Sequence, residues 1–411
     1  MPSDLLDRPA WRATHRRLHA YFGVRLRLVA AIVVCGLVGG ALGAAYLSAL
    51  EVVHDLIGPS VWTPVARVAV LASVGVVVVV LIRVLGRPAD VELLVDNIHV
   101  PDAHHGDVAR LRSLVPVSLA CIGAGGTLGP EAPIVTTNGT LAHRYGTRAG
   151  LEPSDVRTVT ITGMAAGFAV LFGAPLGAAL FALELPHRRG IGYHEAAIPA
   201  CIGAVIGYAC STAIGPIGLD PIWQLPLVGQ FEWIDLPWSV VAGAVGALIA
   251  LVFTLATRAL SAVAEVLPIA VRPAVGGAAL GVLALYSPYA LTNGEFQIEA
   301  LAGTVGATTL VIAASAKLAG AAACVATGWR GGFIIPMFFV GFCVGRLIVD
   351  HLPGAHEWPF VLGVMIAANV GVTKTPLGST TVVAEMSGST LLPGLLVASL
   401  ASLVLTAPMA V

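Results

Sequence analysis

The sequence predicts an all-α polytopic membrane protein, and three observations carry this prediction: the composition, a series of long apolar segments, and a pattern of breaks that recurs in both halves of the chain. Of 411 residues, 57% are hydrophobic and 11% are charged, whereas a soluble domain carries about 25% charged residues. A helix needs roughly 20 apolar residues to cross a bilayer. The apolar segments lie at 28–50, 65–84, 115–124, 159–183, 196–214, 240–257, 274–285, 308–327, 336–349, 361–370 and 391–411.

The segment before the first apolar stretch, residues 1–27, is rich in arginine. Cytoplasmic segments of membrane proteins carry an excess of Lys and Arg, so we expect a cytoplasmic N-terminus. No cleavable signal peptide is apparent, and a multi-pass protein of the inner or plasma membrane is expected. The net charge of −1 and the lack of a basic groove with interleaved aromatics argue against a nucleic-acid partner. The arginines are Arg8, Arg12, Arg16, Arg17, Arg25 and Arg27.

Two apolar segments run into glycine-rich breaks and resume after a proline. The first runs into GTLGPEAP at residues 126–133, and the second into WRGGFIIP at residues 329–336. Proline is tolerated at the start of a helix and disfavoured in its interior. Each motif therefore predicts the start of a second helix inside the membrane.

A second pair of segments repeats in the same order. APLGAALFALEL (174–185) and TPLGSTTVVAEM (375–386) share a Pro-Leu-Gly and place Glu184 and Glu385 at the same position. This recurrence indicates an internal duplication. The polar, Pro-rich and Gly-rich connector is predicted to separate the two halves. The expected division is a first membrane repeat at 28–214, a connector at 215–238 and a second membrane repeat at 239–411.

Matched breaks in duplicated membrane halves are typical of a transport site formed by discontinuous helices. The first N–H groups of a helix lack internal partners and carry partial positive charge, so converging helix starts bind a small anion without Lys or Arg. Glu131 lies in such a mouth. A buried charge in a membrane persists where it faces a cavity or a partner. We interpret Glu131 as a tethered anion that gates the site and carries a proton; the alternative is a carboxylate that only balances the helix dipole.

These motifs resemble those of one family. GTLGPEAP is similar to the Gly-Arg-Glu-Gly-Pro motif of the CLC family of chloride channels and chloride/proton antiporters, and GGFIIP (331–336) to its Gly-x-Phe-x-Pro motif. The Pro-Leu-Gly segments also resemble the family's matching segments, and the similarity extends from about Leu28 to the end of the chain. The resemblance implies a fold of two inverted-topology repeats of tilted and broken helices, and a homodimer. It also implies transport of small inorganic anions, chloride above all, and voltage-gated channels among the relatives.

The resemblance also implies roles for particular residues. Glu131 matches the external gating glutamate. The N–H groups of Phe333 and Ile334 match the amides that coordinate the anion, and the backbone around Glu131 matches the other helix mouth. A bound chloride or other halide is implied, and no cofactor or metal. The anion-binding residues expected in this way are Gly129, Pro130, Ala132, Gly332, Phe333, Ile334 and Ala89.

Three departures from the family pattern bear on selectivity and coupling. Pro130 replaces the arginine before the gate, and Ala89 stands where a serine would touch the central anion. Leu185 replaces the internal, proton-accepting glutamate of the antiporters, with Glu184 just before it. The chain is therefore a passive channel, or Glu184 carries protons, or protons enter by water. A proton-coupled antiporter of unusual selectivity, for example for fluoride, stays an alternative function. For Glu184 and Glu385, a structural role stays an alternative to proton transfer.

The chain ends at Val411, before the helix that supplies a tyrosine to the family's anion site. We therefore expect the final helix to be missing from this sequence, together with the soluble regulatory domains of some relatives. Lys317 lies in an apolar segment and is expected to face the interior, a partner subunit or the interface. There it would add positive potential to the anion path or pair with an acid.

A remote alternative is a membrane-embedded, metal-dependent enzyme. Its site would use the loop PDAHHGD, with Asp102, His104, His105 and Asp107. No motif with catalytic spacing supports it, and a solvated connector is the stronger interpretation. Gly39, Gly40 and Gly43 in the first apolar segment are interpreted as close-packing positions. The cysteines, interpreted as small packing residues, are Cys35, Cys121, Cys201, Cys210, Cys324 and Cys343.

Overall fold

The computed structural model describes residues 9–91, 94–95, 98, 107–186, 194–215, 218–226 and 231–409, without the side chains of 9–25 and 107. Within these residues the chain forms fifteen α-helices and no β-strand. The all-α prediction is confirmed. The loop that suggested a metal site, with Asp102, His104 and His105, lies outside the described residues, as does the side chain of Asp107.

The helices fall into two series of similar order. The first is α1 (Pro9–Ile57), α2 (Pro64–Leu85), α4 (Asp107–Gly123), α5 (Glu131–Arg148), α6 (Pro153–Phe172), α7 (Pro175–Glu184) and α8 (Ala197–Ile214). The second is α9 (Asp235–Glu265), α10 (Arg272–Tyr286), α11 (Glu295–Ala300), α12 (Ala307–Ala326), α13 (Ile334–Val349), α14 (Glu357–Thr373), α15 (Pro376–Ser387) and α16 (Leu392–Thr406). Short 3₁₀ turns lie at Pro59–Val61, His194–Ala196 and Pro288–Ala290.

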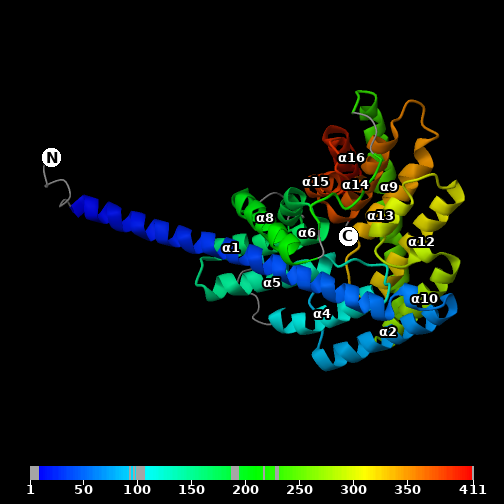
Figure 1. Cartoon of the computed structure of the whole chain (residues 1–411), viewed down its shortest axis with the longest axis horizontal. Helices are drawn as coiled ribbons and strands as arrows, with labels where there is room; N and C mark the ends of the chain where they lie inside the picture. Colours follow the sequence, from blue (N-terminus) through cyan, green and yellow to red (C-terminus); the bar gives the residue numbers. More distant parts are fainter. Residues whose placement is uncertain are drawn as a thin grey trace.

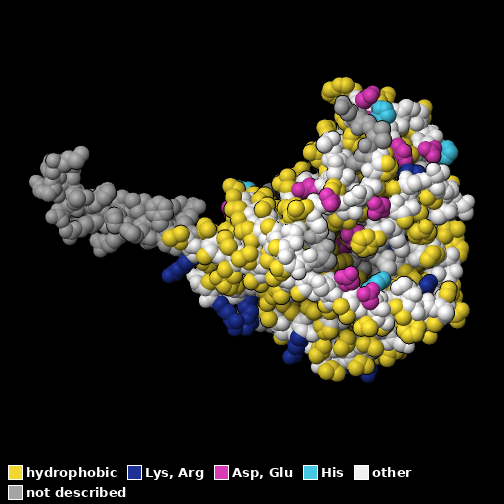
Figure 2. Space-filling model, viewed as in Figure 1, with side chains coloured by type: hydrophobic (Ala, Val, Ile, Leu, Met, Phe, Trp, Pro, Cys, Tyr) yellow, Lys and Arg dark blue, Asp and Glu magenta, His cyan; other side chains and the backbone are white. Residues whose placement is uncertain are grey.

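Within the described residues, six helical segments are long and apolar enough to cross a membrane, and apolar side chains are spread widely over the face seen in Figure 2. This confirms a multi-pass membrane protein. The first helix is continuous from Pro9, so it crosses the predicted boundary at residue 27 without a break, and its N-terminal part projects away from the other helices (Figure 1). The six segments are Leu26–Val61, Pro64–Leu85, Pro153–Phe172, His194–Ile214, Asp235–Glu265 and Ala307–Ala326.

Packing repeats between the two series. Helix α1 packs on α8 as α9 packs on α16, and α5 packs on α6 as α13 packs on α14. Two pairs of equivalent helices also pack on each other, α2 on α10 and α7 on α15, and Figure 1 shows α2 and α10 side by side. The fold therefore consists of two inverted repeats, as expected. The residue boundaries of the repeats stay predictions.

The crossing of α7 and α15 shows the repeat symmetry at the level of single residues. A Cβ added to Gly177 would lie 2.7 Å from the Cα of Val382, and one added to Gly378 would lie 2.5 Å from the Cα of Phe181. The equivalent glycine of each helix thus lets the other helix approach. Small residues at helix crossings are the usual route to close packing in a membrane.

The core is built around α6 and α14, which occupy equivalent places in the two repeats. Of the apolar window in α6, 89% is buried, and the residues of α14 from Trp358 to Val372 are buried without exception. Both helices are therefore surrounded by protein. The predicted packing role of the cysteines agrees with the structure, since all six are free thiols and four of them are buried.

Helix α1 packs closely against α6 and α8 through the glycines singled out in the sequence. A Cβ on Gly39 would lie 2.8 Å from the Cβ of Ala166, and one on Gly43 would lie 2.8 Å from Cγ1 of Val170. A Cβ on Gly40 would lie 3.0 Å from the Cα of Gly207. The close-packing interpretation of these glycines is confirmed.

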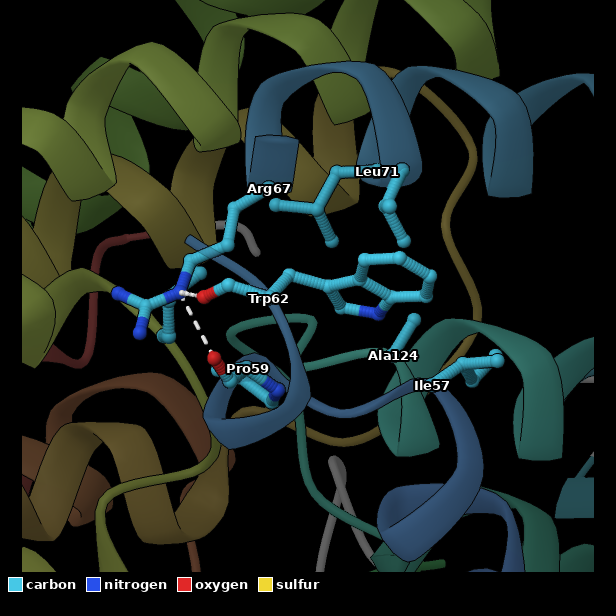
Figure 3. A pocket seen from close by; sticks show the side chains of 8 residues that line it. Ile57, Pro59, Trp62, Arg67, Leu71 and Ala124 are labelled. Atoms are coloured by element: carbon cyan, nitrogen blue, oxygen red, sulfur yellow. Dashed lines mark hydrogen bonds between the residues drawn. The ribbon is translucent and has the colours of Figure 1, made fainter. Parts of the chain in front are cut away.

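The connection between α1 and α2 is stabilised by hydrogen bonds from one arginine. The Nε–H of Arg67 donates to the carbonyls of Pro59 (2.7 Å) and Trp62 (3.1 Å), and Figure 3 shows the guanidinium over this turn. The apolar pocket beside it, lined by Ile57 and Leu71 among others, has no room for a water-sized molecule. This corner is a structural turn and leaves no space for a ligand.

We predict that Gly40→Ala loosens the contact between α1 and α8. The added methyl group would force the two backbones apart, and such overpacking costs about 1–3 kcal/mol. Thermal unfolding of the purified protein in detergent should show a lower Tm than the wild type. The control is Gly306→Ala, because a Cβ there meets nothing within 4 Å; equal Tm values for the two variants would contradict this packing.

Candidate functional site

Two broken helices meet at the centre of the structure. Helix α5 begins at Glu131 and α13 begins at Ile334, so both predicted helix starts are confirmed. The loops before them are joined by a single antiparallel bridge, in which Gly129 N–H donates to Gly332 O (2.7 Å) and Gly332 N–H donates to Gly129 O (2.6 Å). This bridge holds the two N-termini next to each other.

The side chain of Glu131 lies between the two helix starts. It is 2% exposed, and its Oε1 accepts a hydrogen bond of 2.9 Å from the N–H of Ile335, in the first turn of α13. Its Oε2 is buried without a hydrogen-bond partner among the described residues. The carboxylate of one repeat is therefore held by the helix start of the other repeat, which is where partial positive charge is concentrated.

Glycine is required on both sides of this carboxylate. A Cβ on Gly129 would lie 2.6 Å from Cδ of Glu131, and a Cβ on Gly332 would lie 2.9 Å from both Cβ and Cδ of Glu131. Any larger residue would compete with the glutamate for the same space. The two glycines of the bridge thus leave the space that the Glu131 side chain occupies.

A cavity of about 540 Å³ opens beside Glu131. Its wall is mostly apolar, and the residues with polar side chains in it are Glu131 and Thr373. The cavity is large enough for a small anion and several water molecules. Its lining residues are Val91, Val95, Glu131, Ala132, Val135, Phe168, Leu185, Gly331, Gly332, Phe333, Ile334, Val372 and Thr373.

The residues expected to bind the anion divide into two groups. Ala132, Gly332, Phe333 and Ile334 line the cavity together with Glu131. The other three do not line it: Gly129 and Pro130 precede the first residue of α5, and Ala89 packs with Leu111 and Leu114. Their anion-binding roles stay predictions.

The stretch around Ala89 reaches the cavity through its next residues. Asp90 forms an ion pair with Arg330, which directly precedes the glycines of the second motif. This pair ties the stretch to the start of α13, and Val91 and Val95 line the cavity. Valine offers no hydroxyl, so Val91 and Val95, the described residues of this stretch that line the cavity, supply no side-chain donor.

Leu185 and Glu184, neighbours in sequence, have different surroundings. Leu185 lines the cavity, whereas the carboxylate of Glu184 accepts hydrogen bonds from the N–H groups of Leu377 (3.0 Å) and Gly378 (2.7 Å) at the start of α15. Glu184 therefore caps a helix of the other repeat. It is half-buried and is not among the residues that line the cavity.

Glu385 makes the reciprocal contact. Its carboxylate accepts hydrogen bonds from the N–H groups of Leu176 (3.3 Å) and Gly177 (2.7 Å) at the start of α7. Each carboxylate balances the positive end of a short helix whose first N–H groups have no internal partner. These contacts favour the structural interpretation of both residues.

Lys317 faces the protein interior, one of the places expected for it. It is fully buried, and its ammonium donates to the carbonyls of Leu291 (2.8 Å) and Thr292 (2.9 Å). The ring of Phe339 lies 4.8 Å from the same ammonium. The lysine secures the connection between α10 and α12, and it does not line the cavity.

Sequence reasoning missed several residues of the cavity wall, above all Thr373 and Phe168. Both precede the Pro-Leu-Gly segments by a few residues, and a comparison of the two repeats just upstream of these segments would have drawn attention to them. Val91 and Val95 carried no signal, since valine is common throughout this chain.

Comparison with known proteins gives a consistent result. Residues 104–406 match the family model described as voltage gated chloride channel. A chloride/fluoride channel protein of Pseudomonas syringae pv. tomato is 27% identical over 341 residues, which cover 78% of this chain and 72% of that protein. A putative ion-transport protein of Escherichia coli O6:H1 is 28% identical over 253 residues, 60% of this chain and 59% of that protein.

Solved structures share the fold. A slow cyanobacterial Cl⁻/H⁺ antiporter superimposes with a TM-score of 0.81 at 19% identity, covering 92% of this chain and 94% of that one. A CLC-type fluoride/proton antiporter superimposes with a TM-score of 0.79 at 22% identity, covering 93% and 95%. These identities support the same architecture and say nothing of selectivity.

We predict that Gly332→Ala displaces the Glu131 side chain and lowers stability by about 1–3 kcal/mol, the usual range for overpacking. The Tm of the purified protein checks this, with Gly303→Ala as the control, since a Cβ at Gly303 meets nothing within 4 Å. In a Glu131→Gly background the same substitution should have a much smaller effect. If the losses of the two single variants simply add in the double variant, the glycine is not required by Glu131.

Proposed function

The chain belongs to the voltage gated chloride channel family, which is the CLC family, and from this premise we propose that Glu131 gates its anion path. Members of this family are channels or antiporters that carry anions across the membrane, and they are not enzymes. This chain is accordingly an anion transport protein of the membrane. Chloride is the proposed substrate, and the halide is the only bound group that the proposal requires.

The observation that carries the proposal is the hydrogen bond from Ile335 N–H to Glu131 Oε1. A carboxylate in this place is bound as a free anion would be, by the first N–H groups of a helix. A diffusing chloride and the Glu131 carboxylate therefore compete for the start of α13. The path is closed while the carboxylate occupies the site and opens when the carboxylate leaves.

The second oxygen of Glu131 supports a carboxylate that can leave. A buried charged oxygen without a hydrogen-bond partner is unfavourable, so the bound position is only half satisfied. A proton on the carboxylate would weaken its attraction to the helix start, because hydrogen bonds to ionised groups are about twice as strong as neutral ones. Protonation or displacement by chloride would then release the gate.

The chain could transport anions as a passive channel or as a proton-coupled antiporter, and the residues of the cavity wall favour the channel. Leu185 lines the cavity where the antiporters of the family carry an acid, and a leucine cannot accept a proton. Glu184 is engaged with two N–H groups of α15. A proton-coupled antiporter, including one for fluoride, is the second candidate, since Glu131 is itself a proton-binding group and one relative is named a chloride/fluoride channel protein.

We further propose that two copies pair through α7 and α15. These helices have 10 and 12 residues, or roughly 15–18 Å at 1.5 Å per residue, so their ends lie within the membrane. Glu184 and Glu385 are half-buried at these ends. A carboxylate facing lipid is costly, and a second subunit over this surface would shield both.

The proposed orientation places the N-terminus in the cytoplasm. Asp, Glu and His side chains lie on the face seen in Figure 2, whereas Lys and Arg are visible mainly along its lower left margin. Arg144 and Arg148 lie near the end of α5, whereas Asp350 follows α13 and Glu357 begins α14. The positive-inside tendency favours a cytoplasmic location for the side on which Arg144 and Arg148 lie, and the arginines in the sequence of the N-terminal segment favour the same location for that segment.

We predict that Glu131→Gln speeds passive chloride efflux from proteoliposomes. Glutamine keeps the shape of the gate and loses its charge, and a hydrogen bond to a charged group contributes about 1.5–3 kcal/mol, equivalent to a change of about ten- to 100-fold. Paired chloride and proton fluxes under an imposed chloride gradient make the measurement, repeated with fluoride. Glu299→Gln, an exposed acid outside the cavity, is the control.

The proton signal separates the two modes. Chloride efflux without proton movement in the wild type agrees with a channel, whereas proton uptake that Glu131→Gln abolishes would establish the antiporter. A Glu131→Gln flux equal to that of the wild type and of Glu299→Gln would contradict the gate.

We predict that the wild type has the mass of two chains in detergent solution and that Leu176→Trp shifts it toward one chain on dilution. An indole group would disrupt a protein contact at this exposed position of α7. Val77→Trp on α2 is the control, because the two side chains are similarly exposed, 52% and 47%, and Val77 is expected to face lipid. A wild type that has the mass of a single chain would refute the pairing.

A further inference from the structure

Four polar side chains form a buried chain of hydrogen bonds between α14 and α15. The amide nitrogen of Asn369 donates to Oγ of Ser379 (2.9 Å), Ser379 bonds to Oγ1 of Thr375 (2.9 Å), and Thr375 bonds to Oγ1 of Thr373 (2.7 Å). Asn369, Ser379 and Thr375 are fully buried. Such a polar chain is unusual in the core of a protein this apolar and needs an explanation.

The chain of hydrogen bonds ends at the anion cavity. Thr373 is half-buried and lines the cavity together with Glu131 and the start of α13. The next residue, Lys374, has a φ of 60°, a left-handed conformation that is unfavourable for a residue with a side chain. Its ammonium donates to the carbonyls of Gly371 (2.8 Å) and Thr406 (2.7 Å), which holds the corner in this conformation.

The other repeat builds the same corner without any polar side chain. Gly173 ends α6 with φ 57° and ψ 22°, close to the φ 60° and ψ 35° of Lys374 at the end of α14. Aligned on Pro-Leu-Gly, the residues equivalent to the polar chain are apolar: Phe168 stands for Asn369, Phe172 for Thr373, Ala174 for Thr375 and Ala178 for Ser379. Phe168 and Phe172 stack with ring centroids 5.5 Å apart. The polar chain is therefore not needed to fold the corner.

The polar chain also leaves one buried atom unsatisfied. The Oδ1 of Asn369 is buried without a hydrogen-bond partner among the described residues. An unsatisfied buried polar atom is destabilising. An apolar version like that of the first repeat would avoid this, so a role outside the fold is indicated.

The hydrogens of the chain can all point toward the cavity. Each hydroxyl has one hydrogen, and Ser379 accepts from the Asn369 amide. Ser379 can then donate to Thr375, and Thr375 to Thr373. In the structure the Thr373 hydroxyl donates its hydrogen to the carbonyl of Asn369 (3.0 Å from Oγ1 to O), and this carbonyl, as part of α14, already accepts a main-chain bond. Thr373 can therefore give this hydrogen to a ligand in the cavity at little loss.

We propose that Thr373 is a side-chain ligand of the transported anion and that Asn369, Ser379 and Thr375 position its hydroxyl group. This inference rests on the proposed anion path. Hydrogen bonds in a polarised chain strengthen one another, so Thr373 is a better donor than an isolated threonine. It supplies the hydroxyl contact that the stretch around Ala89 lacks, from a different helix and from the other repeat.

A relay of protons along the same chain is the weaker assignment. The far end is the amide of Asn369, which neither accepts nor releases a proton in ordinary conditions. The side chains of the chain contact no described carboxylate. A chain of donors that ends at a cavity is suited to holding an anion.

The test is titration calorimetry of the purified full chain with chloride, in chloride-free buffer, repeated with fluoride. We expect Thr373→Val, which keeps the shape and loses the hydroxyl, to weaken chloride binding about ten- to 100-fold, the range for one hydrogen bond to a charged group. Thr373→Ser should restore most of the affinity. Thr375→Val and Ser379→Ala should cause smaller losses and change the chloride-to-fluoride ratio in the same direction.

Thr380→Val is the matched control. Thr380 is a buried threonine of α15 whose hydroxyl donates to the carbonyl of Pro376 (2.7 Å), and it does not line the cavity. The Thr380→Val variant should bind chloride with the affinity of the wild type. Wild-type affinity in Thr373→Val would overturn the role of Thr373 and leave the anion path intact, whereas a wild type that binds no anion would overturn both. If Thr373→Val does not fold, unchanged affinity and ion ratio in Thr375→Val and Ser379→Ala would overturn the proposal.

Discussion

Two backbone hydrogen bonds, between Gly129 and Gly332, hold the functional centre of this protein together. Polar backbone groups inside a membrane must be satisfied within the protein, and two interrupted helices create many that are not. The bridge satisfies some of them, and it also fixes the starts of α5 and α13 against each other. The absence of a side chain at both glycines leaves the space that the Glu131 side chain occupies. This contact therefore determines where the Glu131 carboxylate lies, how the wall of the cavity is built and how the two repeats are arranged.

Part of this arrangement could be predicted from the sequence, because glycine and proline act locally. The motifs around Glu131 and Phe333 identified the two helix starts, and the repeated Pro-Leu-Gly segments identified the duplication. The members of the cavity wall could not be predicted, since Val91, Phe168 and Thr373 are brought together only by the packing of distant helices. Glu184 and Glu385 were recognised as equivalents. That each caps the helix of the other became visible only in three dimensions, because the capping partners lie about half the chain away.

The two repeats keep the same backbone and differ in chemistry where they meet the cavity. At the corner between α6 and α7 the first repeat uses phenylalanines, and at the corner between α14 and α15 the second uses hydroxyl and amide groups. The first repeat therefore presents an apolar side chain to the cavity, Phe168, and the second presents a residue that can donate a hydrogen bond, Thr373. A site between duplicated halves can specialise in this way, because the equivalent helices α6 and α14 share one apolar core, while the corners at their ends differ in chemistry. The anion would then be held by a helix start, a hydroxyl and an apolar surround, without a buried cation in the described wall.

The central claim is that the Glu131 carboxylate occupies a place on α13 that a free anion can take. The most direct measurement is the anomalous scattering of bromide in crystals of Glu131→Ala grown with that ion. We predict a bromide at hydrogen-bonding distance from the N–H of Ile335, the group that holds the carboxylate in the wild type. An Ile335 amide without bromide, in crystals that show bromide elsewhere in the cavity, would contradict it.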